Sequence, residues 1–175
     1  MSKSKNEYHV VFFDPGGRTG WAHLTLHVRA FTKPENKVLP NILSWSTGEF
    51  SGDEHGQLRA CTELINKARY GPMPFVSRID VGSEDFELTQ LIGGRDLLIP
   101  VRMNAVLAWE CQRLYGTSLN LQARQLRTAV TKDRLKLWKL WPVKGKDAFA
   151  AMQHAVTWVR REKKKSIERP WKLDN

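Results

Sequence analysis

The sequence has 175 residues, 41% of them hydrophobic, which is the size and composition of one globular domain rather than of a disordered chain. Its formal net charge of +10, from 28 basic against 18 acidic residues, favours a polyanionic partner such as nucleic acid. No apolar run approaches the roughly 18 residues of a membrane span. The polar start and the isolated Cys61 and Cys111 indicate neither secretion nor a zinc site, so we expect a cytoplasmic protein that does not contact membranes.

The first motif is a short apolar run that ends on a carboxylate. Val10 to Phe13 is rich in β-branched and aromatic residues, which predicts a buried strand, and Asp14 follows it directly. The next three residues, Pro15 to Gly17, predict a tight turn before a second strand that starts near Thr19. A buried strand often delivers an acid to a polar site in this way, although a hairpin without any chemistry fits the same residues.

The remaining elements follow from periodicity and from helix-breaking residues. The second strand is predicted to cover 21–31, and further strands are predicted at 42–50, 75–86 and 119–121. Helices are predicted from the N-cap Ser51 to Gly71, at 101–115 and at 146–163, with one or two short helices within 123–141. This order predicts an α/β domain whose mixed five-stranded sheet combines an antiparallel three-strand meander with parallel strands, with helices on both faces. We expect one domain over residues 1–165 and a charged tail over 166–175.

Three acidic residues occupy positions that this topology can bring together. Asp14 ends the first strand, Glu84 ends the fourth, and Asp147 opens the last helix. Without a covering Arg or Lys, converging carboxylates repel one another and normally hold a hard cation such as Mg²⁺ or Mn²⁺. In a basic protein the matching substrate is a phosphodiester, attacked by metal-activated water. Each acid also has a structural explanation, for example the helix dipole at Asp147, so spacing alone leaves the cluster open.

The segments FFDPGGRTGWA, SEDF and GKDAFAAMQHAV, in this order, resemble the motifs of RuvC-type Holliday junction resolvases, and the pattern is most similar to the RuvC-like endonucleases of bacteriophages. The resemblance implies an RNase H-like fold and a homodimeric, Mg²⁺- or Mn²⁺-dependent endonuclease that cuts four-way junctions or other branched DNA and leaves 5′-phosphate ends. It would act in the host cytoplasm if a phage encodes it.

The resemblance also assigns roles to single residues. It implies that Asp14 bridges two metal ions, while Glu84 binds one of them and Asp147 the other. The family usually has another Asp or His one helical turn before the last aspartate, where this sequence has Lys144. The fourth ligand is therefore open, and His154 lies too far along the helix to replace it simply. His154 is either an ordinary histidine at the edge of the apolar face or a phosphate contact.

Positive charge is concentrated in the last third of the chain, which is the candidate surface for DNA phosphates. The residues predicted to bind nucleic acid are Arg124, Lys132, Arg134, Lys136, Lys144 and Lys146. Trp138 and Trp141 either stack on unpaired bases or belong to the core. Lys144 either contacts a phosphate or points into solvent.

Two other functions fit part of the sequence. A catalytically impaired RNase H-like DNA-binding protein would keep the fold and the basic surface, and Lys144 favours it, whereas the three retained acids argue against it. The DPGGRTG segment is also similar to the phosphate loop of actin-like sugar kinases. Those enzymes need two such domains around a nucleotide cleft, and 175 residues supply one.

Overall fold

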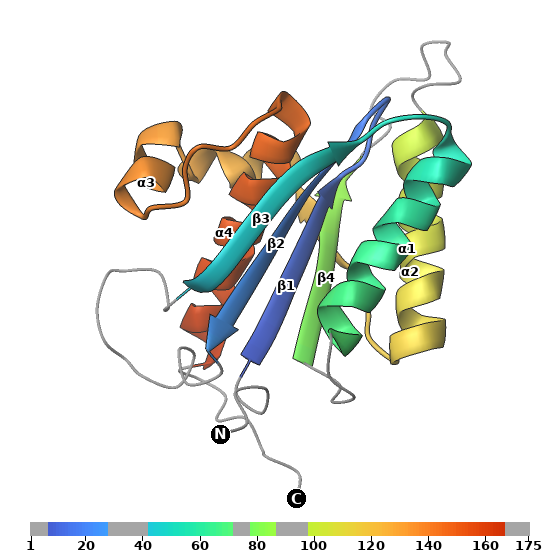
Figure 1. The fold of residues 1–175 in the computed structure, drawn as a ribbon, viewed down its shortest axis with the longest axis horizontal. Helices are drawn as coiled ribbons and strands as arrows, with labels where there is room; N and C mark the ends of the chain where they lie inside the picture. Colours follow the sequence, from blue (N-terminus) through green and yellow to red (C-terminus); the bar gives the residue numbers. More distant parts are fainter. Residues whose placement is uncertain (1–6, 28–41, 72–77, 87–97, 167–175) are drawn as a thin grey trace, which may run out of the picture.

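The computed structural model describes residues 7–27, 42–71, 78–86 and 98–166, which build one five-stranded sheet with helices on both faces (Figure 1). The strands are β1 (Glu7–Asp14), β2 (Thr19–His27), β3 (Ile42–Phe50), β4 (Arg78–Asp85) and β5 (Asn120–Ala123), in the order β3-β2-β1-β4-β5. The first three form an antiparallel meander, and β4 and β5 continue the sheet in parallel with β1. This confirms the predicted fold class.

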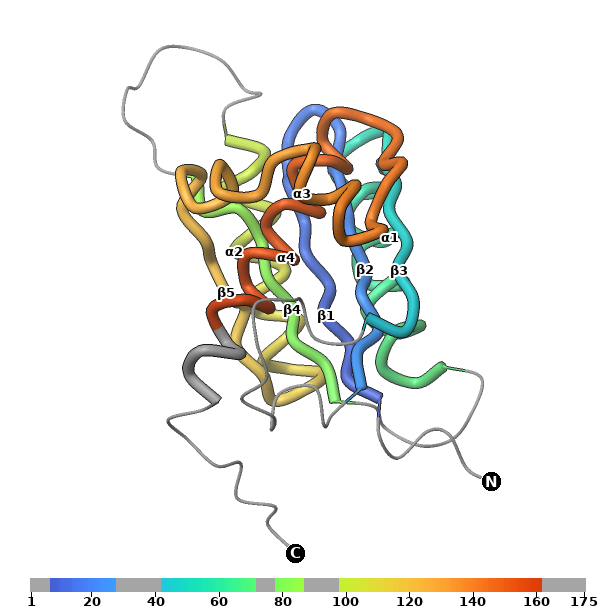
Figure 2. Tube along the Cα trace, turned by 90° about the vertical axis from the view of Figure 1, so that its left-hand side faces the viewer, coloured from blue at the N-terminus to red at the C-terminus, as the bar shows by residue number. Residues whose placement is uncertain are grey.

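Two helices cover one face of the sheet and one long helix covers the other. Helices α1 (Glu54–Tyr70) and α2 (Ile99–Tyr115) lie side by side on the first face, and α4 (Lys146–Ser166) packs across β1 and β2 on the second (Figure 1). Between β5 and α4 the chain forms a 3-10 helix, η4 (Arg124–Ala129), and the short helix α3 (Lys132–Leu137). Figure 2 shows this basic connection crossing the end of the sheet at which β1 and β4 finish.

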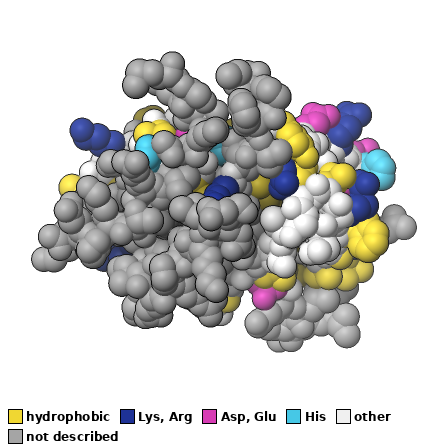
Figure 3. Space-filling model, turned by 90° about the horizontal axis from the view of Figure 1, so that it is seen from below, with side chains coloured by type: hydrophobic (Ala, Val, Ile, Leu, Met, Phe, Trp, Pro, Cys, Tyr) yellow, Lys and Arg dark blue, Asp and Glu magenta, His cyan; other side chains and the backbone are white. Residues whose placement is uncertain are grey.

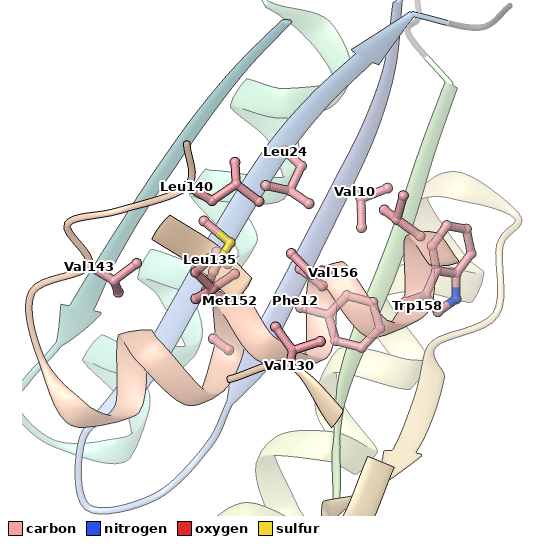
Figure 4. Close-up of a cluster of buried hydrophobic side chains, with 14 of the residues drawn as sticks. Val10, Phe12, Leu24, Val130, Leu135, Leu140, Val143, Met152, Val156 and Trp158 are labelled. Atoms are coloured by element: carbon pink, nitrogen blue, oxygen red, sulfur yellow. The ribbon is translucent and has the colours of Figure 1, made fainter. Parts of the chain in front are cut away.

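The alternation of side chains along β1 builds two separate cores. Val10 and Phe12 point toward α4, whereas Val11 and Phe13 point toward α1 and α2, as the two-residue period of a strand requires. The α4 core also recruits apolar residues of the basic connection, so that this segment is anchored rather than only solvated (Figure 4). Those residues are Val130, Leu135, Leu140 and Val143.

Several boundaries differ from the sequence prediction. The strand predicted at 21–31 is β2, which starts at Thr19, and residues 28–31 lie outside the described ranges, as do 75–77 of the strand predicted at 75–86. Asp53, not Ser51, caps α1, because its Oδ1 accepts from the Gly56 N–H at 2.7 Å. Of the predicted tail only residue 166 is described, and it ends α4. Among the helices in the described ranges, none combines the length and the apolar character needed to cross a membrane.

Candidate functional site

The carboxyl ends of β1 and β4 lie next to each other, and this neighbourhood creates the site. The strands pair in parallel with Phe13 opposite Ser83, so Asp14 and Glu84 both emerge at the following position. The first turn of α4 brings Asp147 to the same rim. All three acids line one cavity of about 460 Å³, together with Pro15, Gly16, Gly17, Arg18, Phe86, Pro100, Arg124, Arg127, Lys146, Phe149, Ala150 and Gln153.

The start of α4 is fixed to the meander by two contacts that the sequence did not reveal. Glu49, near the end of β3, accepts hydrogen bonds from the backbone N–H groups of Asp147 (3.0 Å) and Ala148 (3.4 Å). Gly20 on β2 packs directly against the backbone of Asp147, where any side chain would collide. Glu49 therefore caps the positive end of the α4 dipole. The close contact between Gly20 and the α4 backbone holds Asp147 over the sheet.

Asp14 is in an environment that disfavours its charge. Burial raises its pKa, and the neighbouring carboxylates of Glu84 and Asp147 raise it further, to about 7, although Arg127 opposes the shift. Burial also works against the charge of Glu84, but the hydrogen bond from His154 and the charge of Arg127 outweigh it and hold the pKa of Glu84 below its usual value. The pair thus combines an ionised carboxylate with one that still carries a proton near neutrality.

Arg127 lines the cavity and was not among the site residues predicted from the sequence. Its Nη1 lies 2.6 Å from Glu84 Oε2 and 3.6 Å from Asp14 Oδ2, and its side chain is only 17% exposed. The expectation that no basic side chain covers the acids is therefore wrong. Arg124 is more distant, since its Nε lies 3.9 Å from Glu84 Oε1 and its side chain is 72% exposed.

His154 is completely buried and contacts the site. Its Nε2 lies 2.9 Å from Glu84 Oε2, and its Nδ1 lies 3.2 Å from Oε1 of Gln122, a buried residue of β5. The sequence placed His154 at the edge of the apolar face of α4, whereas the structure buries it completely. No sequence pattern indicated that His154 would contact Glu84.

The predicted DNA-binding residues divide into two groups. Arg124 and Lys146 line the cavity, whereas Lys144 is exposed and is not among the residues that line it. Lys132, Arg134 and Lys136 lie elsewhere on the basic connection. The Lys132 ammonium lies over the Trp141 ring, 5.0 Å from its centroid, and Lys136 Nζ lies 3.8 Å from Asp133 Oδ1.

The other predicted contacts of this segment make local interactions within it or with the core. The Arg134 guanidinium donates to the backbone carbonyl of Ala129. Trp138 and Trp141 are partly buried against the α4 core, which supports the core explanation for both rings.

The three carboxylates are the kind of ligand that a hard cation prefers, but their positions in this structure do not form a complete metal site. All three acids offer oxygen, and the pKa of Asp14 is raised by burial first and then by the neighbouring carboxylates, whose repulsion a cation would relieve. Within the described ranges, however, no three His, Cys, Asp or Glu side chains converge closely enough to bind one metal ion. Arg127 lies where it neutralises two of the acids, so metal binding would require its displacement.

No protein-family model and no curated protein sequence matches the chain. Among solved structures, it is similar to Thermus thermophilus RuvC, with a TM-score of 0.51 and 13% identity over 85% of this chain and 92% of that one. The structure of T. thermophilus RuvC in complex with a Holliday junction substrate gives a TM-score of 0.51 and 12% identity over 88% and 96%. At this identity the likeness concerns the fold, and the chain therefore has the RNase H-like α/β fold that RuvC has.

Proposed function

We propose that the protein is a metal-dependent endonuclease that hydrolyses phosphodiester bonds in branched DNA, of the RuvC-like kind that bacteriophages encode. The observation that carries the proposal is one cavity in which three carboxylates, Asp14, Glu84 and Asp147, are surrounded by cationic side chains. Acids without cations would repel a phosphate, and cations without acids would bind DNA without holding a metal. The RuvC-like fold supports the same function.

The residues of the cavity divide the chemistry between them. Asp14, Glu84 and Asp147 would hold two Mg²⁺ or Mn²⁺ ions, with water and phosphate oxygens as the remaining ligands. When bound, these ions supply the activated water and stabilise the leaving oxygen. Arg18, Arg124 and Lys146 border the same cavity and would bind the phosphates that flank the scissile bond.

The basic connection would extend the DNA surface away from the cavity. It crosses the end of the sheet at which Asp14 and Glu84 emerge, and its apolar residues anchor it on the α4 core (Figure 2). Lys132, Lys136 and Lys144 lie on this segment and are exposed. We propose that these lysines contact backbone phosphates on either side of a branch point, where such contacts position DNA without reading its sequence.

A second candidate is a junction-binding protein that does not cut. The ion pairs of Arg127 with Asp14 and Glu84 favour it, because a resident guanidinium can replace the metal permanently. One experiment separates the two. Synthetic four-way junctions and matched linear duplexes are incubated with the protein in Mg²⁺, Mn²⁺ or chelator, with Asp14→Asn as the control.

The nuclease hypothesis predicts metal-dependent cleavage of the junction that Asp14→Asn abolishes while junction binding is kept, since the substitution removes no cation. Binding without cleavage in either metal would establish the second candidate. Equal cleavage by the Asp14→Asn variant would remove Asp14 from the metal site.

We also propose that the active form is a homodimer, because symmetric cleavage of two junction strands needs two sites. The exposed face of α2 is the candidate interface. Trp109 is 66% exposed there and Val106 41%. Both arginines of α2 form ion pairs, Arg102 with Glu54 at 2.6 Å and Arg113 with Glu110 at 2.9 Å, so they oppose association less than the basic connection would. From the end of the sheet opposite the site, basic and acidic side chains lie side by side where α1 and α2 are (Figure 3).

Light scattering after size exclusion tests this interface. Trp109→Asp should give a monomer, whereas Leu137→Asp, a matched change at a residue 77% exposed on α3, should leave the dimer intact. A dimer that persists in the Trp109 variant places the interface elsewhere.

A further inference from the structure

A chain of buried polar side chains stands behind Glu84, on the side away from the cavity. Gln122 on β5 contacts His154 on α4 at 3.2 Å, and His154 contacts Glu84 on β4 at 2.9 Å, so the chain links three elements. The His154 ring stacks on Phe12 with centroids 6.3 Å apart and an interplanar angle of 10°. A polar ring buried in an apolar core is costly unless it is hydrogen-bonded, and here Nε2 donates to the Glu84 carboxylate while Nδ1 faces the side-chain amide of Gln122.

This chain makes the two oxygens of Glu84 unequal. Oε2 accepts from His154 Nε2 and from Arg127 Nη1 at 2.6 Å. Oε1 faces Arg124, whose Nε is 3.9 Å away on a largely exposed side chain. The two donors to Oε2 differ in their freedom to move. His154 is fully buried and packed on all sides, whereas Arg127 lies on the cavity wall and can turn away from Glu84 to bind a phosphate.

We propose that His154 is a positioning residue: together with Gln122 it holds Oε2 of Glu84 from behind, so that Oε1 is oriented toward the cavity, where it would bind a cation. The inference rests on the proposed function and deepens it, because it assigns how one ligand is oriented. Partners behind a ligand commonly fix its orientation in metal sites, and their loss lowers metal affinity or activity by about 10- to 100-fold.

Three substitutions separate positioning from simple core packing. His154→Gln places an amide N–H near the former Nε2 and keeps the donor to Glu84. His154→Asn is shorter, reaching Gln122 but not Glu84. His154→Phe keeps a ring that can stack on Phe12 but has no polar atom to contact Glu84 or Gln122. Met152→Leu is the matched control, since it changes a fully buried side chain of the same helix without touching an acid.

The readouts are Mn²⁺ affinity of the DNA-free protein by calorimetry, junction affinity in chelator, single-turnover cleavage and thermal unfolding. The Asn and Phe variants should lose about 10- to 100-fold in Mn²⁺ affinity, the Gln and Leu variants should bind Mn²⁺ like the parent, and junction affinity in chelator should be unchanged in all four. If His154→Phe does not fold, the contrast between Gln and Asn decides. Equal Mn²⁺ affinity in these two variants would overturn the positioning role.

The design also separates this inference from the function beneath it. A parent protein that binds Mn²⁺ and cuts junctions, with His154 variants that all behave like the parent, refutes the positioning role alone. A parent that neither binds Mn²⁺ nor cuts refutes the proposed function and this inference with it.

Discussion

Removal of the Arg127 guanidinium should strengthen metal binding and weaken catalysis at the same time. The side chain lies 2.6 Å from Glu84 and 3.6 Å from Asp14, and it is only 17% exposed. At such separations one charge pair near a protein surface is worth about 4 kcal/mol at an effective dielectric constant of about 20. A divalent cation that binds the same carboxylates must compete with this interaction.

The net effect on metal binding is smaller than the Coulomb energy, because a released guanidinium regains water and can bind phosphate. If one third of that energy opposes the metal, Arg127→Gln should tighten Mn²⁺ binding by about tenfold, the equivalent of about 1.4 kcal/mol. Cleavage at saturating metal should fall, since the cation that would meet the phosphate is missing. Arg127→Lys keeps the charge and should bind Mn²⁺ much as the parent does.

Calorimetric Mn²⁺ titration and single-turnover cleavage measure the two effects separately. Arg124→Gln is the matched control within the same cavity. Its guanidinium is 72% exposed and 3.9 Å from Glu84, so solvent screening should leave Mn²⁺ affinity nearly unchanged. The reasoning is refuted if Arg127→Gln has the parent's affinity, or if Arg124→Gln tightens binding equally.

Three further predictions concern other groups. Because the pKa of Asp14 is raised to about 7 and a ligand must be ionised, Mn²⁺ affinity measured by calorimetry should rise with pH up to that value and then level off; a flat profile would contradict it. Glu49→Ala removes the cap of α4 and should cost about 1 kcal/mol in urea unfolding, whereas Glu49→Gln keeps an acceptor and should cost less; equal losses would argue against capping. His9 Nδ1 and His23 Nε2 lie 2.9 Å apart, and burial lowers the pKa of His23 to about 4. Because the unfolded chain then binds a proton more readily, the free energy of unfolding should fall as pH drops from about 6.5 to about 4, by up to about 3 kcal/mol. Urea melts of His23→Gln should lose most of this pH dependence.

The positions of the acids were predictable because local sequence encodes them. The apolar run that ends at Asp14 predicts a buried strand and places the acid at the carboxyl end of that strand. Their convergence also depended on the first and fourth strands being neighbours, and the structure shows that β1 and β4 pair in parallel, so both finish at the same edge of the sheet. The N-cap of α1 was predicted two residues too early, because Ser51 and Asp53 are both good capping residues and the choice depends on the path of the preceding turn.

The contacts between the acids and their neighbours were not predictable from the same patterns. Arg127 reaches Glu84 only because η4 turns the chain back over the end of β4, and a six-residue 3-10 helix has no strong sequence signal. His154 and Glu84 are 70 positions apart, and their contact depends on how α4 packs across β1. Glu49 has the sequence character of a polar residue near the end of a strand. It becomes a helix cap because Gly20 lets α4 approach the sheet.

The electrostatics of the cavity link three events that would otherwise be independent. A proton on Asp14, the guanidinium of Arg127 and a divalent cation each neutralise the same pair of carboxylates, so each opposes the binding of the others. A metal ion that bound near neutral pH would therefore displace the proton of Asp14 and weaken the ion pairs of Arg127 with Asp14 and Glu84. A guanidinium released in this way lies beside the carboxylates, on the cavity wall that a phosphate would meet. The charge that blocks the metal in the free protein would then become available to the substrate once the metal is bound.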